Sequence, residues 1–447
     1  MKLLIIKSST ESKWGSCKVI SPNLHKLYHG LGKGFELDWF ELPEDLMKGE
    51  MKSYSSLVSE LYKHIEATKP DRLVFVDHLP PPPVVVSFLL IQAQLSKLPP
   101  MIFHLYGDFT YFSKQWNYLN EVLEGHPVRF IVASDSQERL VNEFLADDFK
   151  AQRPIDKLCF PVNAKDYFYS SKDRTDLRAE MGLGEDDVVV LYSGRISLQK
   201  NVDLLINEFL KIKKEGKRFH LWVVGAFDDV GADFIGYESY PGYMFAKIQT
   251  ILDGCSQDEL KRVKFFGHLG KASLRVTKAA ADIFASFSLY HDEDYGMSPA
   301  EALATGLTSI LTDWGGYSSF ASSDKWHCEL VSVGLSEFGF ELGTQSFIDL
   351  VENYAGKSDN LRFSHSKEFL AKFSIEGNID VLREILKKDG VPFTGFTWLL
   401  EQHAFAMNEN WSKIKYNKFL APRDKGYYPQ LYNNYISGKT KENNNEK

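Results

Sequence analysis

The stretch Val188–Asn201 reads VVVLYSGRISLQKN, and it decides the fold class. Its first five residues form an unbroken apolar run, which is typical of a strand buried on both faces of a parallel sheet. A turn containing Gly194 and Arg195 follows, and the sequence predicts an amphipathic helix from Val202. A strand, a turn and a helix in this order form the repeating unit of α/β folds.

The same alternation continues on both sides of this stretch. Further short apolar runs, separated by helical segments, lie at residues 3–6, 35–40, 73–76, 101–106, 130–133, 221–224, 263–266, 283–285 and 309–311. Strands that alternate with helices form parallel sheets covered by helices. Because 447 residues are too many for one ordinary core, we expect two Rossmann-like domains that face each other across a cleft.

The boundary between the two domains is predicted near Asn163, in a segment rich in turn-forming residues. Beyond Asp389 the sequence is aromatic and helical in character, and its last residues are polar and rich in Asn. We therefore expect a first domain over 1–162, a second over 163–400, a helical segment over 401–438 that crosses back to the first domain, and a disordered tail over 439–447. A Gly-rich and aromatic insertion over 228–243 is either a lid or an incidental loop.

Composition narrows the range of partners. The four cysteines lie far apart in the sequence, without disulfide or zinc spacing, which favours a reducing, cytoplasmic location. The first apolar run is too short for a signal peptide, and the longest one, 84–91, is too short to cross a bilayer. The net charge of −8 disfavours nucleic acid as a partner. We expect small-molecule partners and at most peripheral contact with a membrane.

The segment 293–306, EDYGMSPAEALATG, predicts the start of a helix. Ser298 is a suitable N-cap, Pro299 suits the first helical position, and Glu301 stands three residues after the cap, which together predict a capping box. Glu293 lies on the preceding loop, where it is free to face a cleft. Alternatively, Glu301 only caps the helix and Glu293 is a solvated loop acid.

The backbone amides of Gly296, Met297 and Ser298 stand at this predicted helix start. Unpaired N–H groups and the helix dipole both favour a bound anion there. Arg195 and Lys200 follow the strand 188–192, at the carboxyl edge of the sheet, where α/β proteins bind ligands. Arg offers a planar fork and Lys a point charge, so the pair suits a diphosphate. Two solvated surface cations are the alternative.

Together these segments resemble the retaining family-four glycosyltransferases, also described as glycosyl transferases group 1, which have the GT-B fold. The resemblance covers most of the second domain. Its motifs are Gly194-Arg195 with Lys200, Phe265-Phe266-Gly267-His268-Leu269, Ala281-Asp282-Ile283, and Glu293 paired with Glu301.

The resemblance implies a role for each of these residues. Arg195 and Lys200 would bind the donor diphosphate together with the amides of residues 296–298, Glu301 would bind the ribose, and Glu293 would contact the transferred sugar. The loop 267–270, which includes Leu269, would border the nucleobase. The second domain would then bind the nucleotide sugar, and the first would bind the acceptor.

The first domain departs from the family pattern at two places. Family members have paired glycines after the first strand, where this chain has Gly15, which we expect to serve alone beside Trp14, a sugar-stacking or packing residue. They also have His-Gly after the fourth strand, where this chain has Tyr106 followed by Gly107. We predict that the Tyr106 hydroxyl holds the donor sugar, and that His104, two residues deeper on the same face, is a packed histidine.

The sequence thus predicts a hexosyltransferase that moves a sugar from a nucleotide diphosphate donor to a glycan, glycolipid or small-molecule acceptor, as in polysaccharide biosynthesis, with retention. We expect no metal and no cofactor, since no acidic cage is apparent and fixed cations can stabilise the leaving phosphate. The alternatives are a nucleotide-sugar hydrolase or epimerase, and a non-catalytic GT-B binding protein. A Rossmann oxidoreductase is disfavoured because no strand leads into Gly-x-Gly-x-x-Gly.

Overall fold

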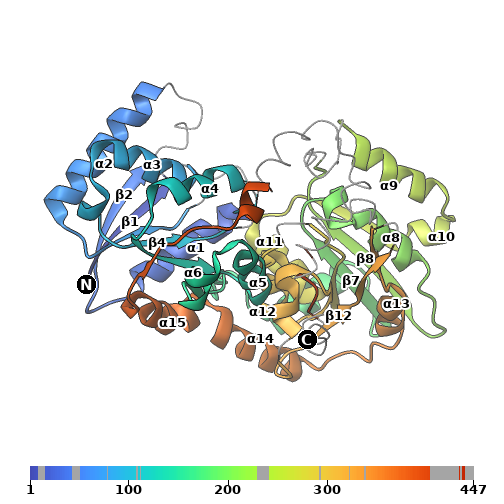
Figure 1. The fold of residues 1–447 in the computed structure, drawn as a ribbon. Helices are drawn as coiled ribbons and strands as arrows, with labels where there is room; N and C mark the ends of the chain where they lie inside the picture. The colour runs from blue at the N-terminus through green and yellow to red at the C-terminus, as the bar shows by residue number, and fades with distance from the viewer. Residues whose placement is uncertain are drawn as a thin grey trace. The chain divides into compact units, whose positions relative to one another are not determined.

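The computed structural model of the protein describes residues 1–8, 16–42, 51–77, 79–106, 109–110, 112–228, 241–290, 293–321, 323–336, 339–402, 432 and 435–437. The chain divides into two compact units. Unit 1 comprises Met1–Pro161 and Ile375–Glu409, and unit 2 comprises Val162–Ser374 and Asn410–Lys447. Each unit is built on its own sheet with helices on both faces (Figure 1).

Unit 1 contains a seven-stranded sheet with the order β15-β5-β4-β3-β1-β2, and β6 also pairs with β5. All pairs are parallel except that of β15 with β5. The central strands are buried apolar runs, as a sheet covered on both faces requires. The strands are β1 (Lys2–Ser8), β2 (Glu36–Leu42), β3 (Arg72–Phe75), β4 (Met101–His104), β5 (Pro127–Val132), β6 (Ile155–Lys157) and β15 (Val391–Pro392).

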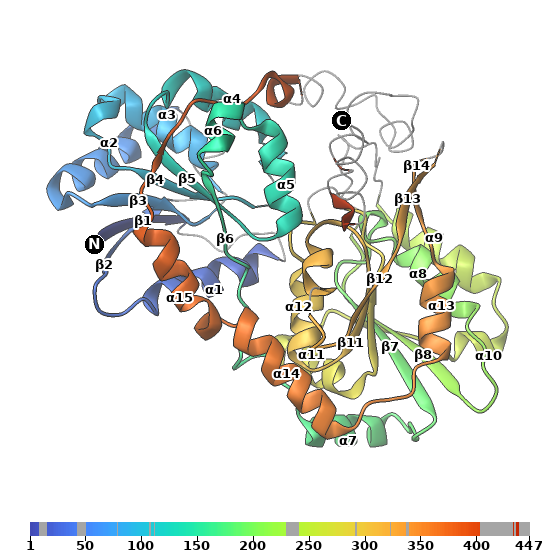
Figure 2. The ribbon, with the colours of Figure 1, turned by 60° about the horizontal axis from the view of Figure 1, so that its bottom comes forward.

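The helices of unit 1 cover both faces of this sheet. In Figure 2, α1 and α15 lie on one face, and α2, α3 and α4 lie on the other. The elements are α1 (Cys17–His29), α2 (Met51–Thr68), α3 (Pro82–Gln92), α4 (Ser113–Val122), α5 (Asp135–Phe144), α6 (Asp147–Ala151), α15 (Ile375–Lys387) and the short 3-10 helix η2 (Leu95–Lys97).

Unit 2 contains a six-stranded, wholly parallel sheet with the order β12-β11-β10-β7-β8-β9. Its central strand β7 is buried along its entire length, as its apolar run predicts. The strands are β7 (Asp187–Ser193), β8 (Arg218–Val224), β9 (Val263–Gly267), β10 (Ile283–Ser286), β11 (Thr308–Thr312) and β12 (Cys328–Val331); a separate antiparallel hairpin is formed by β13 (Val333–Ser336) and β14 (Gly339–Leu342).

The helices of unit 2 also cover both faces. α7, α11, α12 and α14 lie on one face of the sheet, and α8, α9 and α13 lie on the other (Figures 1 and 2). The elements are α7 (Ser171–Glu180), α8 (Val202–Leu210), α9 (Tyr243–Asp253), α10 (Gln257–Leu260), α11 (Lys271–Ala280), α12 (Met297–Ala304), α13 (Gln345–Glu352), α14 (Asp359–Phe373) and the 3-10 helices η4 (Leu198–Lys200) and η6 (Gly315–Ala321).

The chain returns to unit 1 at Ile375, earlier than the residue 401 expected from the sequence. The reason is that β15 pairs with β5, and the buried ring of Phe393 packs edge to face on Phe149. Tyr432 and Tyr435, which fall in the segment expected to cross back, instead pack against Trp314 of unit 2. A sequence pattern of helical residues does not tell which sheet the helix packs on.

Some predicted features lie outside the described residues: Trp14, Gly15, Gly107, the tail 439–447, and residues 229–240 of the insertion. Among the described helices, none combines the length and the apolar character that a membrane span requires.

Candidate donor site

The topology of the unit 2 sheet places Arg195, Lys200 and Glu293 near one another. β7 lies at the centre, with β8 and β9 on one side and β10, β11 and β12 on the other. The connections after β7 and β10 therefore diverge in opposite directions, and in α/β sheets ligands bind at such a switch point, beyond the carboxyl ends of the strands. Arg195 and Lys200 follow β7, and Glu293 follows β10.

Lys200 and Glu293 form a buried ion pair across this switch point. The Lys200 ammonium contacts Oε2 of Glu293, and their side chains are 16% and 9% exposed. Ser288 Oγ donates to the same carboxylate oxygen at 2.5 Å. Burial lowers the pKa of Lys200, and the Glu293 charge opposes this effect. Lys200, a candidate for the diphosphate, is thus in direct contact with Glu293, which the family resemblance relates to the transferred sugar.

Arg195 is held beside this pair by an acid that the sequence analysis did not single out. Its Nη1 donates to Oδ2 of Asp228 at 2.7 Å, and its Nη2 lies 3.3 Å from Oε1 of Gln199. Burial acts to lower the pKa of Arg195, but the Asp228 carboxylate outweighs it and the net shift is upward. The guanidinium is therefore charged and fixed in orientation before any ligand binds.

The predicted capping box at Ser298 is wrong. Helix α12 begins at Met297, one residue before Ser298, and its N-cap is Gly296. Ser298 Oγ instead donates to the backbone oxygen of Ser193 at 2.5 Å, which ties the first turn of α12 to the end of β7. With Gly296 as the N-cap, Ser298 is already the second residue of the helix, so its side chain does not occupy the capping position.

The start of α12 has a shape that only glycine permits. Gly296 has a φ of +97°, and a Cβ there would lie 2.4 Å from a ring atom of Tyr317. Gly315 and Gly316 support the preceding loop: the Gly316 amide donates to the Glu293 backbone oxygen at 2.6 Å, and a Cβ on Gly315 would lie 2.2 Å from that oxygen. The first amides of α12, including those of Met297 and Ser298, stand next to this loop.

Glu301 points into the interior of unit 2. Its Oε2 lies 2.5 Å from Nζ of Lys278, a fully buried cation on α11. Tyr167 completes the cluster, because its hydroxyl also bonds Glu301 and its ring faces the Lys278 ammonium at 4.9 Å. Burial lowers the pKa of Lys278 despite the adjacent carboxylate. Glu301 therefore bonds Lys278 and does not cap the helix. Glu293 is not a solvated loop acid, because it pairs with Lys200.

Leu269, the remaining candidate in unit 2, is half-buried in the loop between β9 and α11. Gly267 enters that loop with a φ of +67°. This loop stands at the same carboxyl edge as Gly194 and Gly225, which follow β7 and β8. A Cβ on Gly225 would lie 1.7 Å from the Gly194 oxygen, so the backbones at this edge approach closely.

Tyr106 lies just beyond the end of β4 in unit 1, and its hydroxyl already has an acceptor. It donates to the backbone oxygen of Val76 at 2.6 Å, and the side chain is buried. The proton of this hydroxyl is therefore engaged, and only its lone pairs remain for a further partner. His104 is buried with its Nε2 2.7 Å from the Tyr28 hydroxyl, as expected for a packed histidine. Burial lowers the pKa of His104 to about 3.

Three residues of the site were missed by sequence reasoning: Asp228, Ser288 and Lys278. Lys278 could have been found from the sequence, because it stands four residues after Leu274 and three before Ala281, on the apolar face of a predicted amphipathic helix. A lysine on such a face needs a buried acid. Asp228 and Ser288 carried none, because single polar residues after a strand are common. Among the described residues, no group of three or more His, Cys, Asp or Glu side chains is arranged to hold a metal ion.

Part of the chain is similar in sequence to a known family and to a curated protein. Residues 173–332 match the family described as Glycosyl transferases group 1. Mannosylfructose-phosphate synthase of Agrobacterium fabrum is 27% identical over 176 residues, which are 39% of this chain and 36% of that protein. The match thus spans about a third of the length of this curated relative.

Two solved structures are similar over most of the chain. A glycosyltransferase from Rickettsia africae matches with a TM-score of 0.61 and 14% identity, over 87% of this chain and 99% of that one. HepE of Anabaena, in complex with UDP-glucose, matches with a TM-score of 0.59 and 14% identity, over 86% and 99%. At these identities the likeness shows the fold. The chain thus has the GT-B fold, and residues 173–332 of its second unit are similar to the glycosyl transferases group 1 family.

Proposed function

We propose that the protein is a retaining, metal-independent hexosyltransferase whose donor is a nucleotide diphosphate sugar. The observation that carries the proposal is the buried contact of Lys200 with Glu293 at the switch point of the unit 2 sheet. A cation for the leaving phosphate and a carboxylate for the sugar are thereby held side by side. The family match and the UDP-glucose bound by HepE support this choice of donor class.

Departure of the nucleoside diphosphate leaves negative charge on its β-phosphate. Arg195, Lys200 and the first amides of α12 are fixed groups that stabilise such charge, a task that other enzymes give to a metal ion. Lys200 has three N–H donors, so it can bond Glu293 and a phosphate oxygen together. An incoming diphosphate favours the charged ammonium and so offsets the effect of burial on the Lys200 pKa.

Glu293 is proposed to act on the donor sugar. Its carboxylate is positioned by Lys200 and Ser288 and is close to the amino end of α12. There it binds a sugar hydroxyl or stabilises the positive charge that develops on the sugar ring, while the leaving phosphate assists in removing the acceptor proton. Glu301 is proposed to bind the ribose, and Leu269 and its loop are proposed to border the base.

We propose that the acceptor is a glycan, glycolipid or small molecule bound through unit 1, as in polysaccharide biosynthesis, and that the protein acts in the cytoplasm with at most peripheral membrane contact. Tyr106 is proposed to contact the donor sugar as a hydrogen-bond acceptor, since its proton is engaged by Val76. We propose neither a nucleic-acid partner nor a cofactor for this reaction.

The test is transfer from UDP-glucose to a panel of sugars in excess EDTA. We expect UDP release that depends on the acceptor, continues without free metal, and gives a product whose anomeric configuration by NMR matches that of the donor. UDP release without an acceptor would indicate a hydrolase, and UDP binding without turnover of any donor would indicate a binding protein. Activity restored only by Mg²⁺ or Mn²⁺ would contradict the role given to Arg195 and Lys200.

A further inference from the structure

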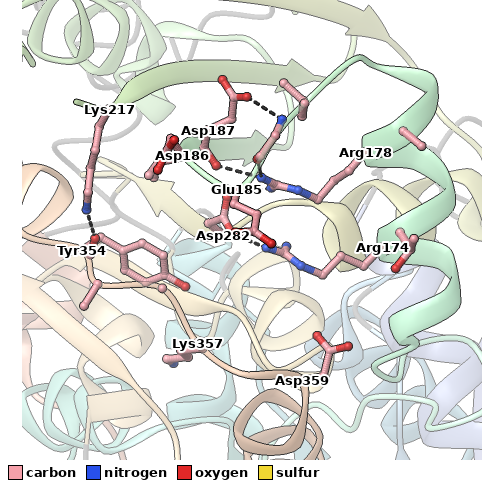
Figure 3. A pocket seen from close by; sticks show the side chains of 17 residues that line it. Arg174, Arg178, Glu185, Asp186, Asp187, Lys217, Asp282, Tyr354, Lys357 and Asp359 are labelled. Carbon is pink, nitrogen blue, oxygen red and sulfur yellow. Dashed lines mark hydrogen bonds and ion pairs between the residues drawn. The ribbon is translucent and has the colours of Figure 1, made fainter. Parts of the chain in front are cut away.

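A cavity lies at the amino edge of the unit 2 sheet, the edge opposite to Arg195, Lys200 and Glu293. The amino ends of β7 and β10, helix α7 and the segment 354–359 enclose about 650 Å³, which we term the amino-edge pocket (Figure 3). The strand β7 starts here at Asp187 and ends at Ser193, next to the donor site. At about 3.3 Å per residue, the strand separates the two sites by roughly 20 Å.

Two arginines from one face of α7 form one wall of this pocket. Arg174 and Arg178 both bond Asp282, at 2.6 and 3.0 Å, and Figure 3 shows both guanidinium groups turned towards that carboxylate. The Val189 amide also donates to Asp282, at 2.8 Å. One buried carboxylate thus serves two partly buried guanidinium groups, which also donate to nearby backbone oxygens.

Lys357 adds a cation from the other side of the pocket. Its Nζ lies 3.2 Å from Nδ1 of His365, and within the described residues it forms no ion pair with a carboxylate. Behind it, Arg362 is fully buried, donates to the Ala281 oxygen at 2.8 Å, and has an Nε without a hydrogen-bond partner in the described structure. In the described part of the chain, Lys357 and Arg362 thus lie close together without a direct carboxylate ion pair.

The acids of the pocket are of two kinds. Asp187 is buried and already accepts from Arg218, His220 and the Gly184 amide, each at 2.6 Å. Asp359 is exposed and accepts from the Tyr169 hydroxyl at 2.5 Å, while Glu185 and Asp186 are exposed. These exposed carboxylates are suitable acceptors for ligand hydroxyl groups.

We propose that the amino-edge pocket binds a small organic phosphate that carries hydroxyl groups, such as a hexose phosphate. The phosphate group lies between Lys357 and the Arg174 wall, and the hydroxyl groups donate to Asp359 and to the acids near Gly184. Phosphate is favoured over a carboxylate because its additional oxygens can accept hydrogen bonds from N–H donors on both sides of the pocket. The cavity is also larger than a bare phosphate needs and lies in the range of small-molecule sites, about 300–1,000 Å³.

Binding of such an anion takes up a proton. Burial, together with the nearby Arg362 charge, lowers the pKa of Lys357 to about 7, so much of the lysine is neutral at pH 8. An adjacent phosphate favours the ammonium form. The other groups that face Lys357 do not titrate in this range: burial and Lys357 lower the pKa of His365 to about 4, and burial raises the pKa of the Cys328 thiol. At pH 8 the phosphate monoester is itself a dianion, so the proton comes from the solution.

The experiment is calorimetric titration of the whole protein with glucose 6-phosphate at pH 8, in two buffers of different ionisation enthalpy. Saturating UDP is present, so that the donor site is blocked. We expect binding that takes up close to one proton, and no binding of glucose. Inorganic phosphate should bind more weakly, and equal affinity for it would refute the organic part of the proposal.

Variants separate the pocket from other cation sites. Lys357→Met should weaken binding about tenfold or more, as loss of a charge-assisted bond does, and should abolish the proton uptake. Lys357→Arg should keep the binding but lose the uptake, since Arg stays charged. Lys211→Met, on an exposed lysine outside the pocket, is the control. Wild-type affinity in Lys357→Met, with unchanged melting and UDP binding, would overturn the proposal without affecting the donor site.

Discussion

The ammonium of Lys278 lies 2.5 Å from the Glu301 carboxylate, and both side chains are buried inside unit 2. Removal of one partner of a buried pair leaves an uncompensated charge, which costs far more than the pair itself contributes. Glu301 is therefore a structural residue of unit 2, whether or not it also binds the ribose of a donor.

Glu301→Gln should lower the free energy of unfolding by about 3 kcal/mol, because Lys278 loses its acid. Lys278→Met combined with Glu301→Gln should recover most of this loss, since no buried charge then remains. Urea unfolding followed by circular dichroism measures both effects. In the stable double variant, UDP affinity tests the ribose role directly, and wild-type affinity there would remove Glu301 from the donor site.

Arg195→Ala and Lys200→Ala should each weaken UDP binding by about 1.5–3 kcal/mol, the value of a hydrogen bond to a charged group. Calorimetry at fixed salt measures the change. Lys211→Ala is the matched control, because that lysine pairs with Glu208 on the surface of the same unit. Unchanged affinity in both site variants would refute the diphosphate role.

Glu293→Gln should separate sugar chemistry from nucleotide binding. Gln keeps an oxygen for the Lys200 ammonium and for the Ser288 hydroxyl, so UDP affinity should stay close to that of the wild type. Transfer should fall by about a hundredfold or more, as expected when an electrostatic group at the reacting centre is removed. Equal loss of UDP affinity and transfer would instead make Glu293 a support for Lys200 only.

Tyr106→Phe removes the hydroxyl that donates a hydrogen bond to the Val76 backbone oxygen. The free energy of unfolding should therefore fall by about 1 kcal/mol. If the hydroxyl also accepts a hydrogen bond from the sugar, transfer should slow while UDP affinity is kept, and Tyr106→His should retain more activity than Tyr106→Ala. Wild-type turnover in Tyr106→Phe, beside a folded but inactive His104→Ala, would transfer the role to His104.

His104 should make the stability of unit 1 depend on pH. Its pKa is about 3 in the folded protein and about 6.5 in the unfolded chain, so the unfolded state binds the extra proton. Its contribution is complete above pH 6.5 and is lost as the pH falls towards 3, by about 2 kcal/mol between pH 7 and pH 5. His104→Gln, which still bonds Tyr28 but does not titrate, should show a shallower slope in urea unfolding. Identical slopes would contradict the buried, neutral histidine.

Local pattern alone predicted most strands of both sheets, but not the edge strands β6, β12 and β15, and it predicted where the candidate residues stand along the strands. The run at 188–192 became the central strand β7, and Arg195 and Lys200 stand beyond its carboxyl end, because alternation of strand and helix leaves few topologies. The domain boundary near Asn163 lies close to the division between the units at Pro161, since turn-forming residues mark it.

The tertiary structure decided which side chains are partners. Ser298 was expected to bond its own helix but bonds Ser193, 105 residues earlier, and Lys278 and Asp228 became partners of Glu301 and Arg195. The return of the chain to unit 1 at Ile375 could not be predicted from the sequence either. The pattern of an amphipathic helix shows which face is buried, but not which sheet covers that face. Spacing along the chain determines faces and ends of elements, whereas pairs of buried charges and hydroxyls depend on segments brought together only by packing.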